Sequence, residues 1–386
     1  MVRRYALVVV GSGPAGVAAA AAYRRAGGDG PVLLVSADPD PPYQRPPLTK
    51  ATLRADAAPT PTPLDEADDL GDTEVELATA ATGLDPQERT IRLGDEEVGF
   101  DRLVLAPGSV PVELPGVDPD AEVHYLRRFA DLQALDRAVR RSRDAVVIGS
   151  GFIGSEAAAS LTQRGLSVTM VSAEDAPQRG RLGERAAQLL TDLLTGYGVE
   201  LRSGVKVQSI EAPRTIHLDD GHTLHPDLIL IAAGVRPATD FITEAGLPLH
   251  EGRIVVDDHL QTPVEGIFAA GDAARGQHAI AGRPINVEHW GDALAMGEVA
   301  GRGAAQADAT WREVPGFWSE IGEHQIQYAA WGDGYDRTEV SEGPGALTIR
   351  YFQDDELVGV FAYNAEQDYQ AGREQLAAEE PDEEEN

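Results

Sequence analysis

The chain has 386 residues, of which 42% are hydrophobic and 25% are charged. Domains usually hold ~100 to 200 residues, so this length suggests two to three domains, and the composition excludes a disordered chain. No apolar run approaches the ~20 residues of a membrane-spanning helix, and the run at residues 6–10 is too short for a signal peptide. We therefore expect a soluble, cytoplasmic protein without a membrane span.

The net charge of the chain is -32, from 64 acidic and 32 basic residues, and only Lys50 and Lys206 are lysines. Such a chain repels polyanions at long range, so we expect no nucleic-acid partner. Cysteine is absent, which excludes disulfides, thiolate metal sites and thiol nucleophiles. We expect no metal site.

Two segments that lie 138 positions apart share one pattern: residues 6–27 read ALVVVGSGPAGVAAAAAYRRAG and residues 144–165 read DAVVIGSGFIGSEAAASLTQRG. Each has an apolar run, a Gly-x-Gly-x-x-Gly turn and an alanine-rich stretch, followed by a second apolar run at residues 32–35 or 168–171. Both segments predict a βαβ unit that binds a dinucleotide, because the glycines allow a tight turn, approach of the pyrophosphate and close packing of helix on strand. The glycines are Gly11, Gly13 and Gly16 in the first unit and Gly149, Gly151 and Gly154 in the second.

The rest of the chain predicts connecting segments and a third region. Residues 39–63 are rich in proline and threonine and predict a long loop with a short helix. Strands that end in glycine turns are predicted at residues 103–109 and 228–234, where the chain passes between domains, and at residues 268–272. Beyond residue 310 aromatic residues become frequent and alternating apolar runs predict an antiparallel sheet.

Four further motifs are more specific than the glycine turns. They read PYQRPPLTK at residues 42–50, GDAA at 271–274, VEHW at 287–290 and VPGFWS at 314–319. With them the chain resembles the two-dinucleotide flavoprotein family typified by glutathione reductase. Within that family it is most similar to the ferredoxin reductase branch, which includes putidaredoxin, rubredoxin and biphenyl-dioxygenase ferredoxin reductases and the core of apoptosis-inducing factor.

The resemblance implies an FAD-dependent NAD(P)H oxidoreductase with an α/β fold. Two Rossmann-like domains would bind FAD and NAD(P), and a small α+β C-terminal domain with an antiparallel sheet would cover the flavin. The implied boundaries are 1–113 and 237–310 for a discontinuous FAD domain, 114–236 for the NAD(P) domain, 311–378 for the C-terminal domain and 379–386 for an acidic disordered tail.

By the same resemblance Lys50 and Glu156 are the catalytic residues. Lys50 should lie beside flavin N5, where a cation would stabilise the electron-rich reduced ring, and Glu156 should hold the ammonium in place. Two other interpretations are open. Lys50 could be a solvated surface charge, and Glu156 could only complement the dipole of its helix.

The resemblance also places residues around the flavin ring. Asp272 should accept a hydrogen bond from the ribityl chain of FAD, with Gly271 allowing close approach. Trp290 should contact the pyrimidine edge, although a lone tryptophan is more often core packing. Phe317 and Trp318 either line the flavin or pack in the interior.

Arg45 and Arg127 should reach the FAD phosphates, and the backbone of Ala81 should contact adenine. The implied FAD residues are Gly11, Gly13, Pro14, Ala15, Gly16, Asp38, Arg45, Lys50, Ala81, Arg127, Gly271, Asp272, Glu288 and Trp290. The implied NAD(P) residues are Gly149, Gly151, Phe152, Ile153, Gly154, Glu156, Glu174 and Gly234.

Both units depart from the family where a carboxylate binds the ribose at the end of the second strand. That position holds alanine in the first unit and serine in the second, and the chain reads Ser-Ala-acid in both. The simplest interpretation is that Asp38 and Glu174 reach the ribose from a shifted register. A carboxylate there favours NADH because it would repel a 2′-phosphate, while Arg179 and Arg181 keep NADPH possible.

The absence of cysteine bears on the acceptor. Relatives that reduce disulfides or peroxide need a cysteine beside the flavin, so here reduced flavin must pass electrons directly to an external acceptor. The resemblance implies single-electron transfer to a ferredoxin-type iron–sulfur protein that feeds a cytochrome P450 or another oxygenase. Two alternatives stay open: a reductase of quinones, dyes or oxygen without a protein partner, and an NADH redox sensor like apoptosis-inducing factor.

The assembly is expected to be a monomer or a homodimer. A net charge of -32 opposes binding of ferredoxins, which are commonly acidic. A local cluster of arginines would have to face such a partner, and the candidates are Arg283, Arg302, Arg312 and Arg337.

Overall fold

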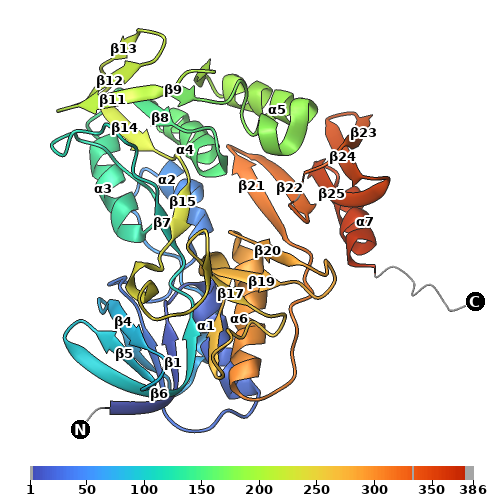
Figure 1. Cartoon of the computed structure of the whole chain (residues 1–386). Coiled ribbons are helices and arrows are strands. Elements are labelled where there is room, and N and C mark those ends of the chain that lie inside the picture. The colour runs from blue at the N-terminus through green and yellow to red at the C-terminus, as the bar shows by residue number, and fades with distance from the viewer. Residues whose placement is uncertain (1–2, 333, 379–386) are drawn as a thin grey trace, which may run out of the picture.

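A computed structural model describes residues 3–332 and 334–378 of the chain. Figure 1 shows three bodies: one that contains both β1 and α6, one that contains α3, α4 and α5, and a smaller one at the C-terminal end. Within the described residues, no helix is long and apolar enough to cross a membrane. The predicted acidic tail, residues 379–386, lies outside the described part of the chain.

The first body is built on a seven-stranded sheet with the order β3-β2-β1-β6-β5-β4 and β18 paired beside β6. Its central strands are parallel and buried on both faces, which explains why they read as continuous apolar runs rather than alternating ones. The strands are β1 (Arg3–Val10), β2 (Val32–Val35), β3 (Glu74–Glu76), β4 (Ala81–Asp85), β5 (Thr90–Leu93), β6 (Glu96–Leu105) and β18 (Ile267–Ala269).

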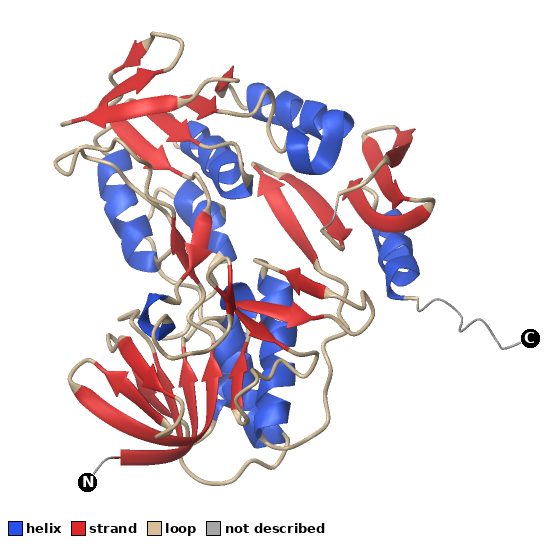
Figure 2. Ribbon diagram, in the orientation of Figure 1, coloured by secondary structure: helices blue, strands red, loops and turns tan. Residues whose placement is uncertain are grey.

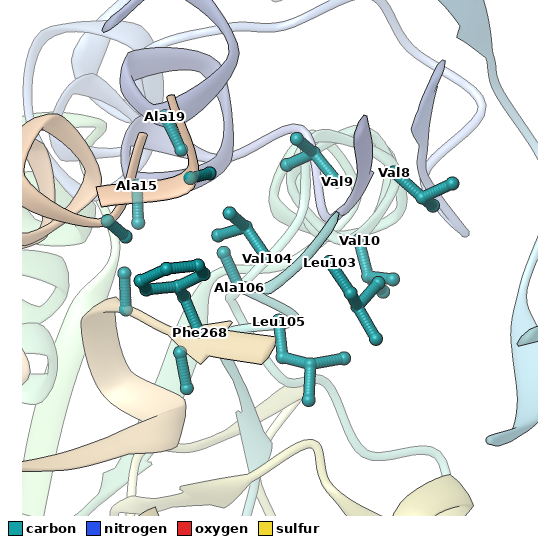
Figure 3. Packing of buried hydrophobic residues seen from close by; sticks show 14 of the residues in the cluster. Val8, Val9, Val10, Ala15, Ala19, Leu103, Val104, Leu105, Ala106 and Phe268 are labelled. Atoms are coloured by element: carbon teal, nitrogen blue, oxygen red, sulfur yellow. The ribbon is translucent and has the colours of Figure 1, made fainter. Parts of the chain in front are cut away.

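Helices α1 (Pro14–Arg25) and α6 (Trp290–Ala304) pack together on this sheet, although they are far apart in the sequence. Small residues let them touch: a Cβ at Gly297 would lie 2.2 Å from the carbonyl oxygen of Ala15, and one at Gly301 would lie 2.2 Å from that of Ala19. Figure 3 shows side chains of β1, β6 and β18 packed together with Ala15 and Ala19 of α1. The N-terminal βαβ unit is thus completed by a helix from the last third of the chain.

The second body has a four-stranded parallel sheet with the order β10-β9-β8-β14. The chain enters and leaves it through an antiparallel pair formed by β7 (Ser109–Pro111) and β15 (Val235–Pro237), so the two connections run side by side. Its other elements are α3 (Phe129–Val139), β8 (Asp144–Ile148), α4 (Phe152–Gln163), β9 (Ser167–Ser172), α5 (Arg179–Gly196), β10 (Glu200–Ser203), β11 (Val207–Glu211), β12 (Thr215–Leu218), β13 (Thr223–Leu224) and β14 (Leu228–Ile231).

The third body is a five-stranded antiparallel sheet, and α7 packs on β25 (Figure 2). The predicted fold class is therefore confirmed, while the residue numbers of the domain boundaries stay a prediction. The elements are β21 (Gly316–Ile321), β22 (His324–Ala330), β23 (Arg337–Gly343), β24 (Ala346–Gln353), β25 (Glu356–Tyr363) and α7 (Glu366–Ala377).

Short elements extend the first body, and the helical turns at residues 46–54 pack against α4 of the second body. The loop predicted at residues 39–63 contains the helical turns η1 and α2, as expected from its composition. These elements are η1 (Pro46–Thr49), α2 (Ala51–Arg54), η2 (Asp65–Leu70), η3 (Asp240–Ile242), β16 (Leu249–His250), β17 (Arg253–Val256), η4 (Gly271–Ala273), β19 (Ala274–Gln277) and β20 (Pro284–Asn286).

A buried acid joins the first and third bodies. Asp292 lies in the first turn of α6, is 3% exposed and receives a hydrogen bond from the backbone N–H of Gly316 in β21. Its Oδ2 has no hydrogen-bond partner in the described part of the chain. Burial raises the pKa of Asp292 to about 8, against the opposing effects of that N–H and of the Arg373 charge. Asp292 is therefore protonated at neutral pH in the folded protein.

We expect Asp292→Asn to make the protein more stable at pH 8 and to change it little at pH 4. An unfolded carboxyl loses its proton near pH 4, whereas the folded one keeps it up to about pH 8, so the wild-type stability falls as pH rises between these values. The thermal unfolding midpoint, measured from pH 4 to pH 9, should show this divergence. Parallel pH profiles of variant and wild type would contradict a raised pKa.

Candidate functional site

The two glycine turns have the same local structure. A Cβ at Gly11 would lie 2.1 Å from the carbonyl oxygen of Ala106, and a Cβ at Gly16 would lie 1.8 Å from the carbonyl oxygen of Gly11. Gly149 and Gly154 repeat these close approaches in the second unit, at 2.2 Å each. Helices α1 and α4 begin within the turns, directly after Gly13 and Gly151, and neither N-terminus has a side-chain cap. The unpaired N–H groups in their first turns are therefore available to an anionic pyrophosphate.

A pair of serine hydroxyls stabilises each turn. Ser12 Oγ lies 2.7 Å from Ser36 Oγ, and Ser150 Oγ lies 2.6 Å from Ser172 Oγ. Each pair links the glycine turn to the end of the second strand and is buried. These pairs were not predicted from the sequence, although the shared Gly-Ser-Gly and Ser-Ala-acid patterns were a signal that could have found them.

The two acids that follow these serines differ in environment. Asp38 is buried, and it accepts hydrogen bonds from the hydroxyl of Tyr43 at 2.8 Å and from the backbone N–H of Asp40 at 3.3 Å. Glu174 is exposed, and its backbone N–H donates to Ser172 Oγ at 3.1 Å. Both acids lie at the strand ends where a ribose would bind. Their contact with ribose stays a prediction.

Arg45 provides a cation directly over the first glycine turn. A Cβ at Gly13 would lie 2.8 Å from Arg45 Nη1, and Arg45 Nε is buried without a hydrogen-bond partner in the described residues. The nearest carboxylate in an ion pair, Asp38, is 3.9 Å away. Burial and the neighbouring charge of Arg127 lower the pKa of Arg45. A partly buried guanidinium with an unused donor beside a glycine cradle fits the phosphates of FAD.

Asp272 and Arg127 are paired with each other. Arg127 Nη2 lies 2.7 Å from Asp272 Oδ2, and Ser109 Oγ donates to the same oxygen at 2.6 Å. This contact joins η4 of the first body to the segment that leads into the second. The predicted contacts of Asp272 with the ribityl chain and of Arg127 with phosphate stay predictions. The structure shows that the two side chains contact each other.

The carboxylate of Glu156 accepts hydrogen bonds from four donors. The ammonium of Lys50 lies 2.8 Å from its Oε2, and Thr49 Oγ1 lies 2.5 Å from the same atom. Its Oε1 accepts from Ser319 Oγ at 2.6 Å and from the backbone N–H of Glu320 at 3.3 Å. Lys50 is 7% exposed and Glu156 is 4% exposed. Lys50 is therefore not a solvated surface charge, and Glu156 does more than complement a helix dipole.

This carboxylate connects all three bodies, because Glu156 comes from α4, Thr49 and Lys50 from the first body, and Ser319 from β21. Thr49 and Ser319 are site residues that the sequence analysis missed. No spacing signal could have found Ser319, which lies 163 positions from Glu156.

Helix α4 attaches to the first body along one face. Ser160 Oγ donates to the carbonyl oxygen of Thr49 at 2.7 Å, and Arg164 Nη1 donates to that of Leu53 at 2.9 Å. Together with Glu156 these side chains are spaced by four residues, which places them on one side of the helix. The segment that carries Lys50 is thus held by the helix whose N-terminus forms the second glycine turn.

Aromatic side chains line the space between the second glycine turn and the first body. Phe317 packs edge-on against Phe152 at 4.6 Å between ring centroids and stacks on His289 at 4.3 Å. Burial and then the charge of Arg181 lower the pKa of His289 to about 3, so this ring stays neutral. Trp318 is 41% exposed and its ring centroid lies 4.8 Å from Lys50 Nζ, which excludes interior packing.

The remaining predicted residues lie near these groups. Trp290 is the first residue of α6 and packs against the edge of the core. Glu288 forms an ion pair with Arg253. Ala81 begins β4, and Gly234 directly precedes β15. Their contacts with the dinucleotides stay predictions.

The four arginines considered for a partner surface do not form one cluster. Arg283 and Arg312 both lie close enough to His278 to lower its pKa, an effect smaller than that of burial. Arg302 lies in the last turn of α6, and Arg337 forms ion pairs on β23 of the third body. Because α6 and β23 belong to different bodies (Figure 1), the four arginines do not gather at one place.

Residues 5–297 match the family described as pyridine nucleotide-disulphide oxidoreductase, and residues 316–386 match the family described as reductase C-terminal. The chain is 33% identical to rhodocoxin reductase of Rhodococcus erythropolis, over 97% of this chain and 90% of that protein. It is 30% identical to a ferredoxin–NAD(P)(+) reductase of Sphingomonas sp, over 96% of this chain and 92% of that protein.

Among solved structures, the covalent putidaredoxin reductase–putidaredoxin complex contains a similar chain. The TM-score is 0.88 at 26% identity, over 97% of this chain and 93% of that chain. The similarity therefore extends over all three bodies.

We expect Glu156→Leu to lower the free energy of unfolding by about 3 to 5 kcal/mol, because it leaves the buried ammonium of Lys50 without its counter-charge. The double variant Lys50→Met/Glu156→Leu should lose less unfolding free energy than Glu156→Leu, since no charge is then left unpaired. Urea unfolding of the holoprotein measures both. The exposed pair of Arg185 and Glu342 is the control, and Arg185→Gln should change stability by less than about 1 kcal/mol. A double variant less stable than Glu156→Leu would show that the two charges do not support each other.

Proposed function

Because the chain belongs to the pyridine nucleotide-disulphide oxidoreductase family, we propose that it is an FAD-dependent ferredoxin–NAD(P)+ reductase that passes electrons to a ferredoxin-type iron–sulfur protein. The observation that carries this proposal is the buried pair of Lys50 and Glu156 at the meeting of three bodies, in a chain without cysteine. The names of the relatives support the same activity.

The donor set fits both dinucleotides. The first glycine turn, Arg45 and Asp272 would hold FAD, and the second glycine turn with the N-terminus of α4 would hold the pyrophosphate of NAD(P)H. When bound, FAD supplies the hydride-accepting and one-electron-donating chemistry that side chains lack. Phe152, the first residue of α4, packs on Phe317 and would lie beside the path of the nicotinamide toward the first body.

The protein's own contribution is electrostatic. The ammonium of Lys50 would present a fixed positive charge where electron density increases on reduction of the flavin. It is held in a buried site, where charges are poorly screened. Glu156 fixes the position of that ammonium. The hydroxyls of Thr49 and Ser319 fix the carboxylate in turn, so that the pair needs no rearrangement during turnover.

Electrons must leave the site without a thiol, because the chain has no cysteine. We propose that the partner binds at the rim where the three bodies converge, near the exposed ring of Trp318. The similar solved structure is a complex of putidaredoxin reductase with putidaredoxin, which supports a protein partner. An oxygenase or a cytochrome P450 would then be the final consumer. Location in the cytoplasm and the oligomeric state stay predictions.

We further propose that NADH is the preferred donor. Arg179 begins α5, the helix that follows β9, and it is engaged by Asp175 at 3.7 Å and by Glu184 at 2.7 Å. Glu174 adds another negative charge beside it. Arg181 contacts Phe317 instead, so it is not directed at the ribose. This region therefore disfavours a 2′-phosphate.

We expect Lys50→Ala to retain FAD and its yellow colour and to slow flavin reduction by NADH at least tenfold. The lost cation acts on the reduced ring, while the phosphates are held elsewhere. Stopped-flow absorbance of the flavin band measures this rate at saturating NADH. An unchanged rate would remove Lys50 from the catalytic residues. Absence of flavin bands in the wild type would contradict the proposal that this chain binds FAD.

The wild type should use NADH with at least a tenfold higher kcat/KM than NADPH, equivalent to about 1.4 kcal/mol in transition-state binding. Glu174→Gln should narrow this ratio because it removes one charge that repels the 2′-phosphate. Steady-state rates with an artificial dye acceptor measure it independently of any protein partner. A preference for NADPH would mean that Arg179 binds the phosphate despite its two acidic neighbours.

The association rate with an acidic ferredoxin should increase at moderate salt. The net charge of -32 repels the partner over distances greater than one Debye length, ~10 Å at 0.1 M salt, and the candidate arginines are too few to outweigh it. Rates of ferredoxin reduction from 10 to 300 mM salt would show this dependence. A decrease would mean that a local arginine patch dominates. Reduction of quinones or dyes but of no ferredoxin from the same genome would overturn the proposed function.

A further inference from the structure

The first turn of α5 is bound to the third body. It begins after Gln178, which has a left-handed backbone with φ 56°, and it is separated from the rest of the helix by a break at Gly183. The hydroxyl of Tyr351 donates to the carbonyl oxygen of Leu182 at 2.9 Å, and a Cβ at Gly183 would lie 2.4 Å from the hydroxyl of Tyr335. These contacts fix residues 178–183 against β24 and its neighbours.

Arg181 extends from this turn into the space between the bodies. Its guanidinium carbon lies 5.4 Å from the ring centroids of both Phe317 and Tyr328, and its Nη2 lies 3.3 Å from His289 Nε2. These partners come from the first and third bodies. Arg181 thus contacts the same Phe317 ring that packs against Phe152, the first residue of α4.

The partners of Arg181 are all neutral. Its neighbours on α5 are paired with acids: Arg179 with Glu184 at 2.7 Å and Arg185 with Glu342 at 2.5 Å. In contrast, no carboxylate in residues 3–332 and 334–378 lies within 4.0 Å of Arg181. In a chain with twice as many acids as bases, an exposed guanidinium held among aromatic rings is placed to receive an anion from outside.

The position of Arg181 shows which part of the dinucleotide it would meet. The adenosine ribose belongs at the end of β9, near Glu174, and the pyrophosphate belongs over the second glycine turn. Arg181 lies beyond that turn, against Phe317 and His289, on the side of the first body. The nicotinamide half of NAD(P)H must run in this direction to reach the flavin. The only anion in that half is the phosphate nearest the nicotinamide ribose.

We propose that Arg181 binds the nicotinamide-side phosphate of NAD(P)H from the side opposite the N-terminus of α4. This deepens the proposed function and rests on its pyridine-nucleotide half alone, since no property of the acceptor enters. The N–H groups of α4 and the guanidinium would contact the pyrophosphate from two sides. Because the aromatic rings hold the planar guanidinium in place, little side-chain freedom is lost on binding.

Calorimetric titration of the FAD-loaded protein with two fragments tests the proposal. ADP-ribose carries both phosphates, whereas AMP carries only the adenosine-side one. We expect Arg181→Gln to weaken ADP-ribose binding at least tenfold, which corresponds to about 1.4 kcal/mol, and to change AMP binding less than twofold. Arg181→Lys should recover part of the loss because it keeps the charge. Arg185→Gln is the matched control on the same helix and should change neither.

Three other outcomes of these titrations would overturn the proposal. If Arg181→Gln weakened the binding of ADP-ribose and of AMP equally, Arg181 would either contact the adenosine side or have a role in the fold. The flavin spectrum and the unfolding midpoint of the variant would distinguish these two explanations. Unchanged ADP-ribose binding would remove the phosphate contact. A wild type that binds neither fragment would overturn the pyridine-nucleotide site itself, whereas normal fragment binding without ferredoxin reduction would overturn only the proposed acceptor.

Discussion

The buried carboxylate of Glu156 is the interaction on which the arrangement of the three bodies depends. Burying a charge is costly unless a counter-charge and hydrogen bonds replace the lost water, and here an ammonium, two hydroxyls and a backbone N–H do so. Because these donors come from the first and third bodies while Glu156 belongs to the second, the carboxylate is satisfied only when all three are docked. Docking of the bodies and placement of Lys50 are thus one event.

The same geometry aligns the two dinucleotide sites. The first residues of α4 form the second glycine turn, and its next turns hold the Lys50 segment through Glu156, Ser160 and Arg164. A single helix therefore spans from the expected nicotinamide-nucleotide site to the expected flavin site. These contacts lie on one side of α4, which therefore faces the Lys50 segment. The equivalent helix of the first unit, α1, packs against α6 instead, so the two units differ in what their helices contact although their sequences are similar.

Charge acts on two length scales in this molecule. Over long distances the net charge of -32 opposes anionic ligands and acidic partners. Within the site, three cations lie at defined positions: Arg45 over the first glycine turn, Lys50 beside Glu156, and Arg181 among aromatic rings. Short-range contacts with these groups are little affected by the distant surface acids because salt screens the latter. An acidic protein can therefore still bind anionic dinucleotides.

The sequence alone was enough for the two glycine turns and the exclusion of a cysteine relay, because these depend on composition or on residues close together in the chain. It also predicted the complete fold class and paired Lys50 with Glu156, although only through a family resemblance. The tertiary structure decided what lies between distant segments: the hydroxyl of Ser319 on Glu156, the two serine pairs, and the direction of Arg181. Arg179 and Arg181 are equivalent in the sequence, two positions apart, yet one faces acids near the ribose end and the other faces aromatic rings of another body. That difference arises from the break at Gly183 and the docking of the third body, since contacts between segments far apart in the chain exist only once the domains have packed.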